Sequence, residues 1–582
     1  MFKKLLPYIG KYKKETILTP LMIVGEVLME ILIPFLMAKI IDEGIPGNDI
    51  PYITFLGVCM IGMALVSLVF GALGGKYAAV SGSGFAANLR KAEFERVQAF
   101  SFANVDKFST ASLVTRMTTD IMFTRMTFTT FIRSLARSPL MLIGSTIMAF
   151  SINARLALIF LVAVPILAFI IFFISIRSHP LFLAMFKKYD KMNARVQESL
   201  IGIRVVKAFV RGDYEKEEFQ LASEDVMKAE RRAQRLMVFM APSMQFAMYA
   251  CLIAVAYFGG THIVAGSMSV GELMGFIAYI NQILISLMMI SMAFVTFMIS
   301  RASMERIVEV LDEVPDISDE NADENLEVAH GGIVFDHVDF SYFKDENNLH
   351  LQNVSLIIRP GTTVGILGGT GSSKSTLVNL IARLYDVTRG RVVVGGHDVR
   401  EYKLKTLRES VAMVLQKNTL FSGTIRENLR WGNEDATDEE IEAACRVACA
   451  HDFVMSFPDG YDTDLSQGGV NLSGGQKQRL CIARALLKQP KILILDDSTS
   501  AVDTATDASI RAELKKHRGE MTTLIIAQRV ASVMDADQII VLDDGRVNAV
   551  GTHEKLLATN AIYREVYEAQ LKGKEEGGEV NG

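Results

Sequence analysis

Six long apolar segments, separated by more polar stretches, dominate the first half of the chain. Most of them contain the ~20 apolar residues that a helix needs to cross ~30 Å of hydrocarbon. Lipid offers no hydrogen bonds, so a crossing segment must satisfy its own backbone groups, as a helix does. The pattern therefore predicts an all-α, six-helix transmembrane domain in residues 1–315. The predicted spans are residues 17–41, 53–75, 133–153, 155–177, 236–258 and 270–300.

Two polar stretches, 76–132 and 178–235, follow the second and fourth spans and are compatible with helix. We expect them to be long cytoplasmic helix extensions; a separate inner domain in each stretch is the alternative. The first outer loop, DEGIPGNDIPY, has no Lys or Arg, whereas the N-terminus and both polar stretches are rich in them. Because Lys and Arg concentrate on the cytoplasmic side, both termini are predicted to be cytoplasmic.

Polar residues inside the predicted spans have either a functional or a structural role. Glu26 and Glu30 are one helical turn apart and share a face, so they are either a functional pair or a structural pair facing the bundle interior. Gln245, Asn281 and Gln282 either line a polar pathway or hydrogen-bond neighbouring helices. A methionine stripe offers an adaptable surface for apolar ligands or simply packs. Its members are Met288, Met289, Met292 and Met298.

Composition supports a mixed chain. Half of the 582 residues are hydrophobic, and the net charge is −5, with a mean hydropathy of +0.27. This charge argues against a nucleic-acid binder. The five cysteines are scattered and fit ordinary thiols better than a metal site.

The character of the chain changes after an acidic linker at 316–330. Strand-like runs then alternate with helix-like runs from 331 to about 570, which predicts an α/β domain. Residues 571–582, LKGKEEGGEVNG, are expected to be a disordered tail.

A glycine-rich loop opens this second domain between a predicted strand and a predicted helix. It matches G-x-x-x-x-G-K-S except that Ser373 replaces the last glycine and adds a Cβ. Backbone N–H groups of such a loop cradle phosphates, while Lys374 reaches the β/γ-phosphates and Ser375 binds Mg²⁺. The predicted ATP-binding loop comprises Gly368, Gly369, Thr370, Gly371, Ser372, Ser373, Lys374, Ser375 and Thr376.

About 100 residues later come LSGGQKQR (472–479) and KILILDDSTSAVD (491–503). With these motifs the chain resembles the ATP-binding-cassette (ABC) family, and six spans before one such domain resemble a type IV exporter half-transporter. The resemblance implies that Tyr342 stacks on adenine, that Asp496 holds Mg²⁺ and that Gln416 senses Mg²⁺ and couples to the membrane helices. It further implies that signature residues contact ATP bound to a partner chain, and that residues near 100–118 and 205–222 carry coupling contacts. Those signature residues are Ser473, Gly474, Gly475 and Gln476.

The sequence departs from the family pattern at three positions of its own ATP site. Asp497 stands where the family usually has the catalytic glutamate, Gln528 replaces the switch histidine, and Ser373 alters the loop. A missing methylene withdraws a general base from its water, and misplacement of about 1 Å can cost ~100-fold in rate. Gln528 cannot carry positive charge, although the transition state spreads charge over phosphoryl oxygens.

The signature itself is intact, so the chain resembles the degenerate-site subunit of heterodimeric bacterial multidrug exporters. We therefore predict an exporter of hydrophobic drugs or lipids that uses ATP and Mg²⁺ and pairs with a non-identical half-transporter. A slow homodimeric exporter is one alternative, and an ATP-gated regulatory or channel subunit that does not pump is another.

Overall fold

The computed structural model describes residues 2–320, 322–497, 503–517 and 519–578. The chain divides into two compact units. The first contains the residues up to Gln98 together with Phe108–Glu313, and the second contains Ala99–Lys107 together with the residues from Val314 onward. The sequence analysis assigned residues 99–107 to the transmembrane domain; in the structure this short segment groups with the second unit through the hydrogen bonds described below.

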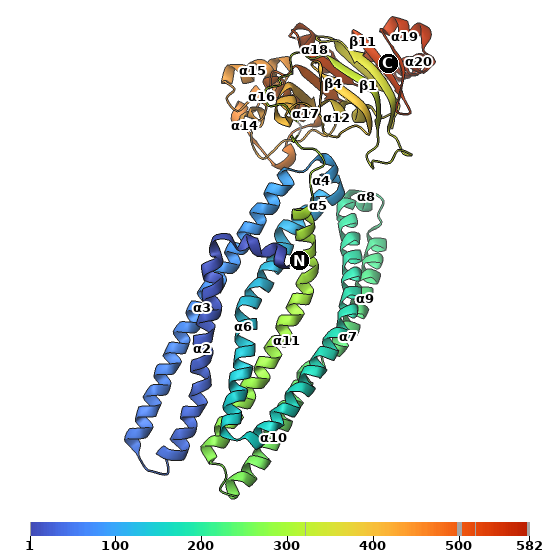
Figure 1. Ribbon diagram of the computed structural model, residues 1–582. Coiled ribbons are helices and arrows are strands. Elements are labelled where there is room, and N and C mark those ends of the chain that lie inside the picture. The colour runs from blue at the N-terminus through green and yellow to red at the C-terminus, as the bar shows by residue number, and fades with distance from the viewer. Residues whose placement is uncertain (1, 321, 498–502, 518, 579–582) are drawn as a thin grey trace. The chain divides into compact units, whose positions relative to one another are not determined.

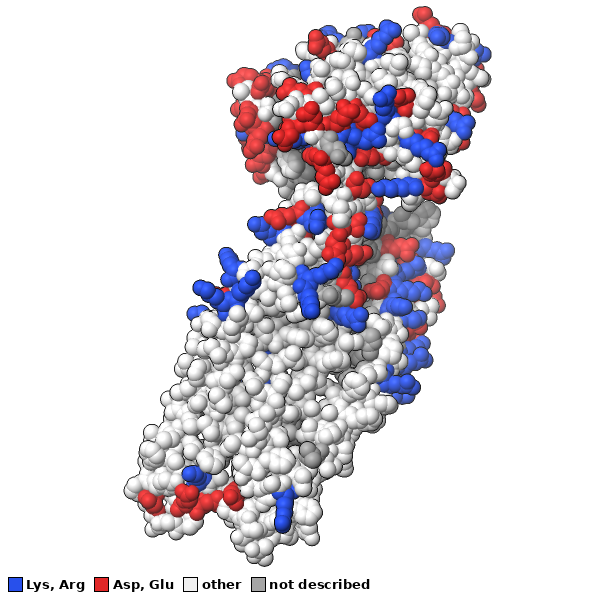
Figure 2. All heavy atoms as spheres, in the orientation of Figure 1, with Lys and Arg blue, Asp and Glu red and all other residues white. Residues whose placement is uncertain are grey.

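The first unit contains, among its described residues, six helical runs that are long and apolar enough to cross a membrane (Figure 1). Each run continues well beyond its apolar core, as the helix-compatible polar stretches predicted. On the face in Figure 2, a broad band nearly free of charge crosses this unit, with charged side chains gathered at both of its ends. The elements are α1 Phe2–Leu5, η1 Leu6–Tyr12, α2 Lys13–Lys39, η2 Ile40–Gly44, α3 Ile50–Gln98, α4 Phe102–Phe108, α5 Thr110–Thr115, η3 Arg116–Asp120, α6 Ile121–Ile152, α7 Ala154–Ile201, α8 Ile203–Ala208, α9 Gly212–Met237, α10 Met240–Val264 and α11 Val270–Asp312.

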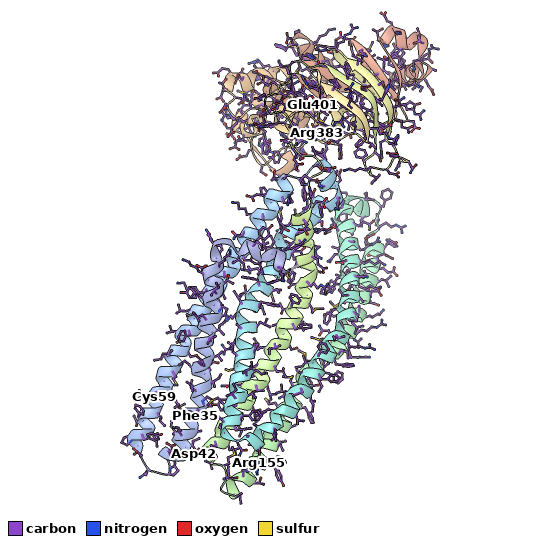
Figure 3. All side chains as sticks on the ribbon, viewed as in Figure 1. Phe35, Asp42, Cys59, Arg155, Arg383 and Glu401 are labelled. Carbon is purple, nitrogen blue, oxygen red and sulfur yellow. The ribbon has the colours of Figure 1, made fainter. Side chains whose placement is uncertain are left out.

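Asp42 ties two of these helices together at one end of the unit (Figure 3). Its carboxylate accepts hydrogen bonds from the backbone N–H groups of Gly271 at 2.6 Å and Glu272 at 3.1 Å, and from the Ser269 hydroxyl. These groups form the first turn of α11, whose N–H donors lack helical partners. The carboxylate therefore caps α11 and fixes the end of α2 beside it.

The second unit is built on a six-stranded sheet in the order β12-β11-β3-β10-β9-β6, flanked by a four-stranded antiparallel sheet β2-β1-β4-β5. In the larger sheet β11, β3, β10, β9 and β6 are parallel and β12 is antiparallel. Strands β9 and β10 are buried along their whole length, as strands covered on both faces are. The strands are β1 Ile333–Phe340, β2 Leu351–Ile358, β3 Thr363–Gly368, β4 Arg389–Val394, β5 His397–Asp398, β6 Val411–Val414, β7 Gly423–Thr424, β8 Asp464–Leu465, β9 Ile492–Asp496, β10 Thr522–Ile526, β11 Gln538–Asp543 and β12 Arg546–Gly551.

Helices connect these strands and surround the sheet. The predicted α/β fold, with a transmembrane domain before it, is therefore confirmed. The remaining elements are α12 Lys374–Ile381, α13 Leu404–Ser410, α14 Ile425–Arg430, α15 Asp438–Val447, α16 His451–Met455, η4 Gly460–Asp462, η5 Gln467–Gly469, α17 Gly474–Leu487, α18 Thr504–Lys516, η6 Val530–Ser532, α19 His553–Thr559 and α20 Ala561–Gly578.

The acidic linker and the C-terminal residues lie at the two ends of this unit's main segment. The acidic linker lies along the unit: the Asp323 N–H donates to the Glu401 carbonyl at 2.8 Å, and Glu324 pairs with Lys403 at 2.7 Å. Helix α20 continues to Gly578, so residues 571–578 are helical where a disordered tail was expected. Leu, Gln, Lys and Glu, which fill much of this region, are good helix formers. Residues 579–582 lie outside the described part of the chain.

Candidate nucleotide-binding site

The parallel strands bring four predicted site segments to one edge of the sheet. The phosphate loop, residues 368–376, follows β3, and Gln528 lies two residues beyond β10. Asp496 ends β9, Asp497 comes next, and Gln416 lies two residues beyond β6. Because β3, β10, β9 and β6 are neighbours in this order, their carboxyl ends form one continuous site. Ligands of parallel α/β sheets bind at this edge.

The phosphate loop is folded tightly around the Lys374 side chain. The Lys374 ammonium donates to the carbonyl oxygens of Gly368 at 2.9 Å and Gly369 at 2.7 Å. Burial is the main cause that lowers the pKa of Lys374, with Asp497 and Asp496 acting in the opposite direction. Ser373, where the motif has glycine, adopts the left-handed conformation with φ of 68°. Serine therefore occupies a backbone conformation here that glycine adopts more readily.

Two of the three residues predicted to bind magnesium, Ser375 and Asp496, lie together at the base of the loop, and the third is Gln416. The Ser375 hydroxyl donates to Asp496 Oδ1 at 3.0 Å. Asp496 is only 5% exposed, and this burial raises its pKa. A hydroxyl and a carboxylate are oxygen ligands of the kind that Mg²⁺ prefers, so this pair would hold a magnesium ion, which would neutralise phosphate charge.

Asp497 is held by two amide side chains. Its Oδ2 accepts a hydrogen bond from Gln528 Nε2 at 3.0 Å and from Gln416 Nε2 at 3.4 Å. The Asp497 backbone adopts φ of 46°, and its N–H donates to the Ile526 carbonyl at 3.1 Å. Sequence reasoning identified all three side chains, but it did not anticipate that both glutamines converge on one carboxylate oxygen.

Tyr342 packs beside the helix that follows the phosphate loop. Its hydroxyl lies 2.9 Å from the Thr376 hydroxyl. Its ring makes edge contacts with Phe340, His350 and Tyr385, with centroids 4.8, 4.9 and 5.0 Å away. The structure thus brings the predicted adenine-stacking residue next to the phosphate loop.

Tyr385 was not singled out by the sequence analysis. Its hydroxyl donates to Asp106 Oδ2 at 2.8 Å, and its ring lies 6.1 Å from that of Phe102. Nearby, the Ser101 hydroxyl donates to Asp316. These contacts explain why residues 99–107 belong to the second unit and lie close to Tyr342. Residues 205–222, the other predicted coupling segment, form the end of α8 and the start of α9.

The signature motif forms the N-terminus of α17. Ser473 is the N-cap: its hydroxyl accepts from the Gln476 N–H at 3.3 Å, and Gln476 Oε1 accepts from the Ser473 N–H at 2.8 Å. Gly474 and Gly475 form the first helical turn between them. Within the described part of the chain, the Ser473 and Gln476 side chains each accept from the other residue's backbone N–H, and neither bonds this chain's own phosphate loop.

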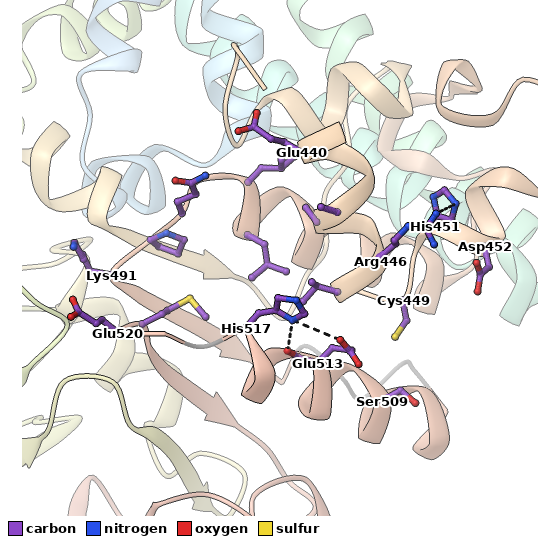
Figure 4. Close-up of a pocket in the computed structure, with 18 residues that line it drawn as sticks. Glu440, Arg446, Cys449, His451, Asp452, Lys491, Ser509, Glu513, His517 and Glu520 are labelled. Atoms are coloured by element: carbon purple, nitrogen blue, oxygen red, sulfur yellow. Dashed lines mark hydrogen bonds and ion pairs between the residues drawn. The ribbon is translucent and has the colours of Figure 1, made fainter. Parts of the chain in front are cut away.

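A separate cavity of about 1000 Å³ lies in the second unit among α15, the end of α17 and α18 (Figure 4). His517 and Glu513 interact at its wall, with the His517 ring nitrogen 3.0 Å from the Glu513 carbonyl oxygen. None of the predicted ATP-site residues lines this cavity. The nucleotide site is therefore defined by the strand ends and not by this cavity.

Comparison with known proteins agrees with this architecture. Residues 16–288 match the model for the ABC transporter transmembrane region, and residues 351–500 match that for the ABC transporter. The uncharacterized ABC transporter ATP-binding protein YfiB of Bacillus subtilis is 37% identical over 98% of both chains. A fatty acid ABC transporter ATP-binding/permease protein of Mycobacterium bovis is 35% identical over 82% of this chain and 75% of that protein.

A solved structure of a bacterial Atm1-family ABC exporter with ATP bound has the same fold, with a TM-score of 0.84. At 24% identity it covers 96% of this chain and 99% of its own. The fold and site define a membrane ATPase with its transmembrane and ATP-binding domains fused in one chain. This chain belongs to the ABC transporter family.

Proposed function

We propose that this chain is one half of an ATP-driven exporter and pairs with a second, non-identical ABC half-transporter. Its own phosphate loop binds ATP and hydrolyses it poorly, while its LSGGQ motif completes the active site of the partner. The observation that carries the proposal is the double hydrogen bond from Gln528 and Gln416 to Asp497 Oδ2. A general base must lie within hydrogen-bond reach of the attacking water. The Asp497 carboxylate is one methylene shorter than that of glutamate, and two amides already occupy one of its oxygens, so it is a poor base.

The polar chemistry around the phosphate loop supports binding without efficient turnover. Lys374 and the loop N–H groups would bind the phosphates of ATP. Ser375 and Asp496 would hold Mg²⁺, which neutralises phosphate charge when it is bound. Tyr342 would stack on adenine, and its position beside Thr376 of the phosphate loop supports this role. Gln528 can donate a hydrogen bond but brings no positive charge, so stabilisation of the transferring phosphoryl group is incomplete.

The signature motif, in contrast, has all of its parts. The capping box formed by Ser473 and Gln476 fixes the first turn of α17, and the N-terminus of a helix favours anionic oxygens. Gly474 and Gly475 allow a close backbone approach. This end of α17 is suited to the γ-phosphate of ATP bound by another chain, which supports a productive site on the partner.

The cargo is a hydrophobic drug or lipid, moved out of the cytoplasm or the inner leaflet. Both termini and the ATP-binding unit lie in the cytoplasm, at the inner (plasma) membrane. The broad apolar surface of the six helices supports such a cargo, and so does the similarity to a fatty acid transporter and to the fold of an exporter.

The test is the steady-state ATPase rate of this chain purified alone in lipid nanodiscs, together with the amount of ATP it retains. We expect retained ATP with almost no turnover. Brisk turnover would refute the degenerate site and favour a homodimeric exporter. Uphill movement of a hydrophobic cargo into vesicles by the complete pair separates a pump from an ATP-gated channel, which moves its cargo only downhill.

A further inference from the structure

The six apolar spans contain, away from their ends, three charged residues: Glu26, Glu30 and Arg137. The structure brings all three together, although Arg137 is more than 100 positions away along the chain. One guanidinium nitrogen of Arg137 on α6 pairs with Glu26 Oε1, and the other pairs with Glu30 Oε2 at 2.8 Å. We call these three residues the charged triad.

The charged triad is not electrically balanced. It joins two carboxylates to one guanidinium, so one negative charge is uncompensated when all three are ionised. Both oxygens of Glu30 accept from Arg137. Glu26 uses only Oε1, and its Oε2 has no hydrogen-bond partner among the described residues. A residual charge in a low-dielectric setting is costly unless another charge pairs with it.

Glu26 is buried, but the other two residues of the charged triad are partly exposed. Glu26 is only 9% exposed, and Gly71 of α3 lies so close that a Cβ there would approach its carboxyl carbon to 3.2 Å. The Arg137 and Glu30 side chains are 34% and 28% exposed, so a head group can reach the triad from their side. Polar atoms of Gln282 adjoin it, since Gln282 Nε2 donates to the Glu30 carbonyl at 3.3 Å.

Apolar side chains surround the triad on the same helices. Ile23, Val27 and Ile31 on α2 and Met141 on α6 belong to the buried core of this unit. Glu30 lies 12 residues from Asp42 at the end of the helix, a rise of about 18 Å at ~1.5 Å per residue. That depth passes the middle of a ~30 Å hydrocarbon core. The surroundings suit a molecule with an apolar body and one charged group.

We propose that the charged triad is a subsite for the cationic group of an amphiphilic substrate. A monovalent cation would bring the site to two positive and two negative charges, with Glu26 Oε2 as its direct partner. An anionic amphiphile would instead place three negative charges around one guanidinium. The inference rests on the proposed export of hydrophobic drugs or lipids and names their chemical class.

The test compares two hydrophobic ions of the same shape and opposite charge, tetraphenylphosphonium and tetraphenylborate. Binding of each is measured by equilibrium dialysis to the full chain in nanodiscs, with lipid-only nanodiscs subtracted. We expect tetraphenylphosphonium to bind at least tenfold more tightly, a difference of about 1.4 kcal/mol or more. Equal binding, or a preference for tetraphenylborate, would overturn the proposal.

Substitutions within the charged triad test whether it causes the preference for the cation. Glu26→Gln and Glu30→Gln each leave one carboxylate and one guanidinium, and each is expected to erase the preference for the cation. Glu95→Gln is the matched control, because Glu95 is exposed and forms an ion pair with Lys91 at 3.7 Å; it should leave binding unchanged. If the charged triad merely fastens α2 to α6, the two variants would be less stable than the unsubstituted chain but would show the same preference between the two ions.

Both triad variants are checked for bound nucleotide before use, and if Glu26→Gln does not fold, the more exposed Glu30→Gln decides. The measurement needs neither hydrolysis nor a second chain, so it is independent of the degenerate site. ATP-driven export of neutral amphiphiles without cation preference would refute the subsite and leave the proposed exporter standing.

Discussion

Gln528 Nε2 donates to Asp497 Oδ2 at 3.0 Å, and this contact joins two departures from the family pattern in one hydrogen bond. The two residues follow adjacent parallel strands, β10 and β9. A histidine at 528 and a glutamate at 497 would change the charge and the reach of the site together. The two substitutions are therefore expected to act as a pair, since residues in contact are energetically coupled.

We predict that the double substitution Asp497→Glu with Gln528→His raises ATP hydrolysis at this chain's own site by at least about tenfold. The longer carboxylate gains the reach of a general base, and histidine can bear positive charge toward the phosphoryl oxygens. Single-turnover hydrolysis of bound ATP in nanodiscs measures the effect. Each single substitution serves as a control and should give a smaller gain. An unchanged rate in the double variant would contradict the proposed cause of slow hydrolysis.

Asp496 gives a prediction with a defined pH dependence. Burial raises the pKa of this carboxyl above its ordinary value of 3.8, so the folded state holds the proton more strongly than the unfolded state does. Stability is therefore lost as pH rises from 3.8 through the raised folded pKa. Asp496→Asn removes this loss, and its nucleotide-free melting temperature at pH 7 should equal or exceed that of the unsubstituted chain.

The same Asp496→Asn variant should lose most of the stabilisation that Mg²⁺-ATP gives, because ligand-linked stability falls with affinity. Melting curves with and without Mg²⁺-ATP at several pH values check both parts. A variant that melts lower than the unsubstituted chain without nucleotide, or that keeps the full Mg²⁺-ATP shift, would contradict the assignment of Asp496.

Gly368 and Gly369 are adjacent in the phosphate loop, and substituting each by alanine gives a test and its control. A Cβ at Gly368 would lie 2.4 Å from the Leu542 carbonyl oxygen and 2.5 Å from the Ser372 hydroxyl, whereas a Cβ at Gly369 would meet nothing within 4 Å. Gly368→Ala must displace backbone and should reduce ATP affinity by at least about tenfold, or about 1.4 kcal/mol. Gly369→Ala should leave the fold intact. Fluorescent ATP titration and melting curves test the pair; equal effects would show that the loop is not packed as described.

Tyr385→Phe tests the attachment of residues 99–107. The substitution keeps the ring contacts and removes the hydrogen bond to Asp106, which is worth about 1 kcal/mol. Amide exchange of residues 99–107 should accelerate about fivefold, with little change in the core strands. Tyr402→Phe is the control, since it removes a bond from a tyrosine hydroxyl to the Val394 carbonyl elsewhere in the same unit. Unchanged exchange in Tyr385→Phe would show that other contacts hold the segment.

The sequence predicted what is local in the chain and missed what depends on strand order and long-range packing. The phosphate loop, Asp496 and the signature motif at Ser473 were readable because each belongs to a short motif. The convergence of Gln416 and Gln528 on Asp497 follows from the order β6-β9-β10, which no local pattern encodes. Glu26 and Glu30 were recognised as a pair, but only packing of α2 against α6 revealed Arg137.

Residues 99–107 have a consequence for how the protein is made. The ATP-binding unit is discontinuous: a nine-residue piece is synthesised first, and the rest begins only at Val314. At 5–20 residues per second, the interval between them is roughly 10–40 s. Phe102 and Asp106 have no Tyr385 to contact until residue 385 has been synthesised, and a fragment cut at 314 would leave Tyr385 without them. The early segment therefore makes its contacts with Tyr385 only late in translation, when the later part of the chain has been synthesised.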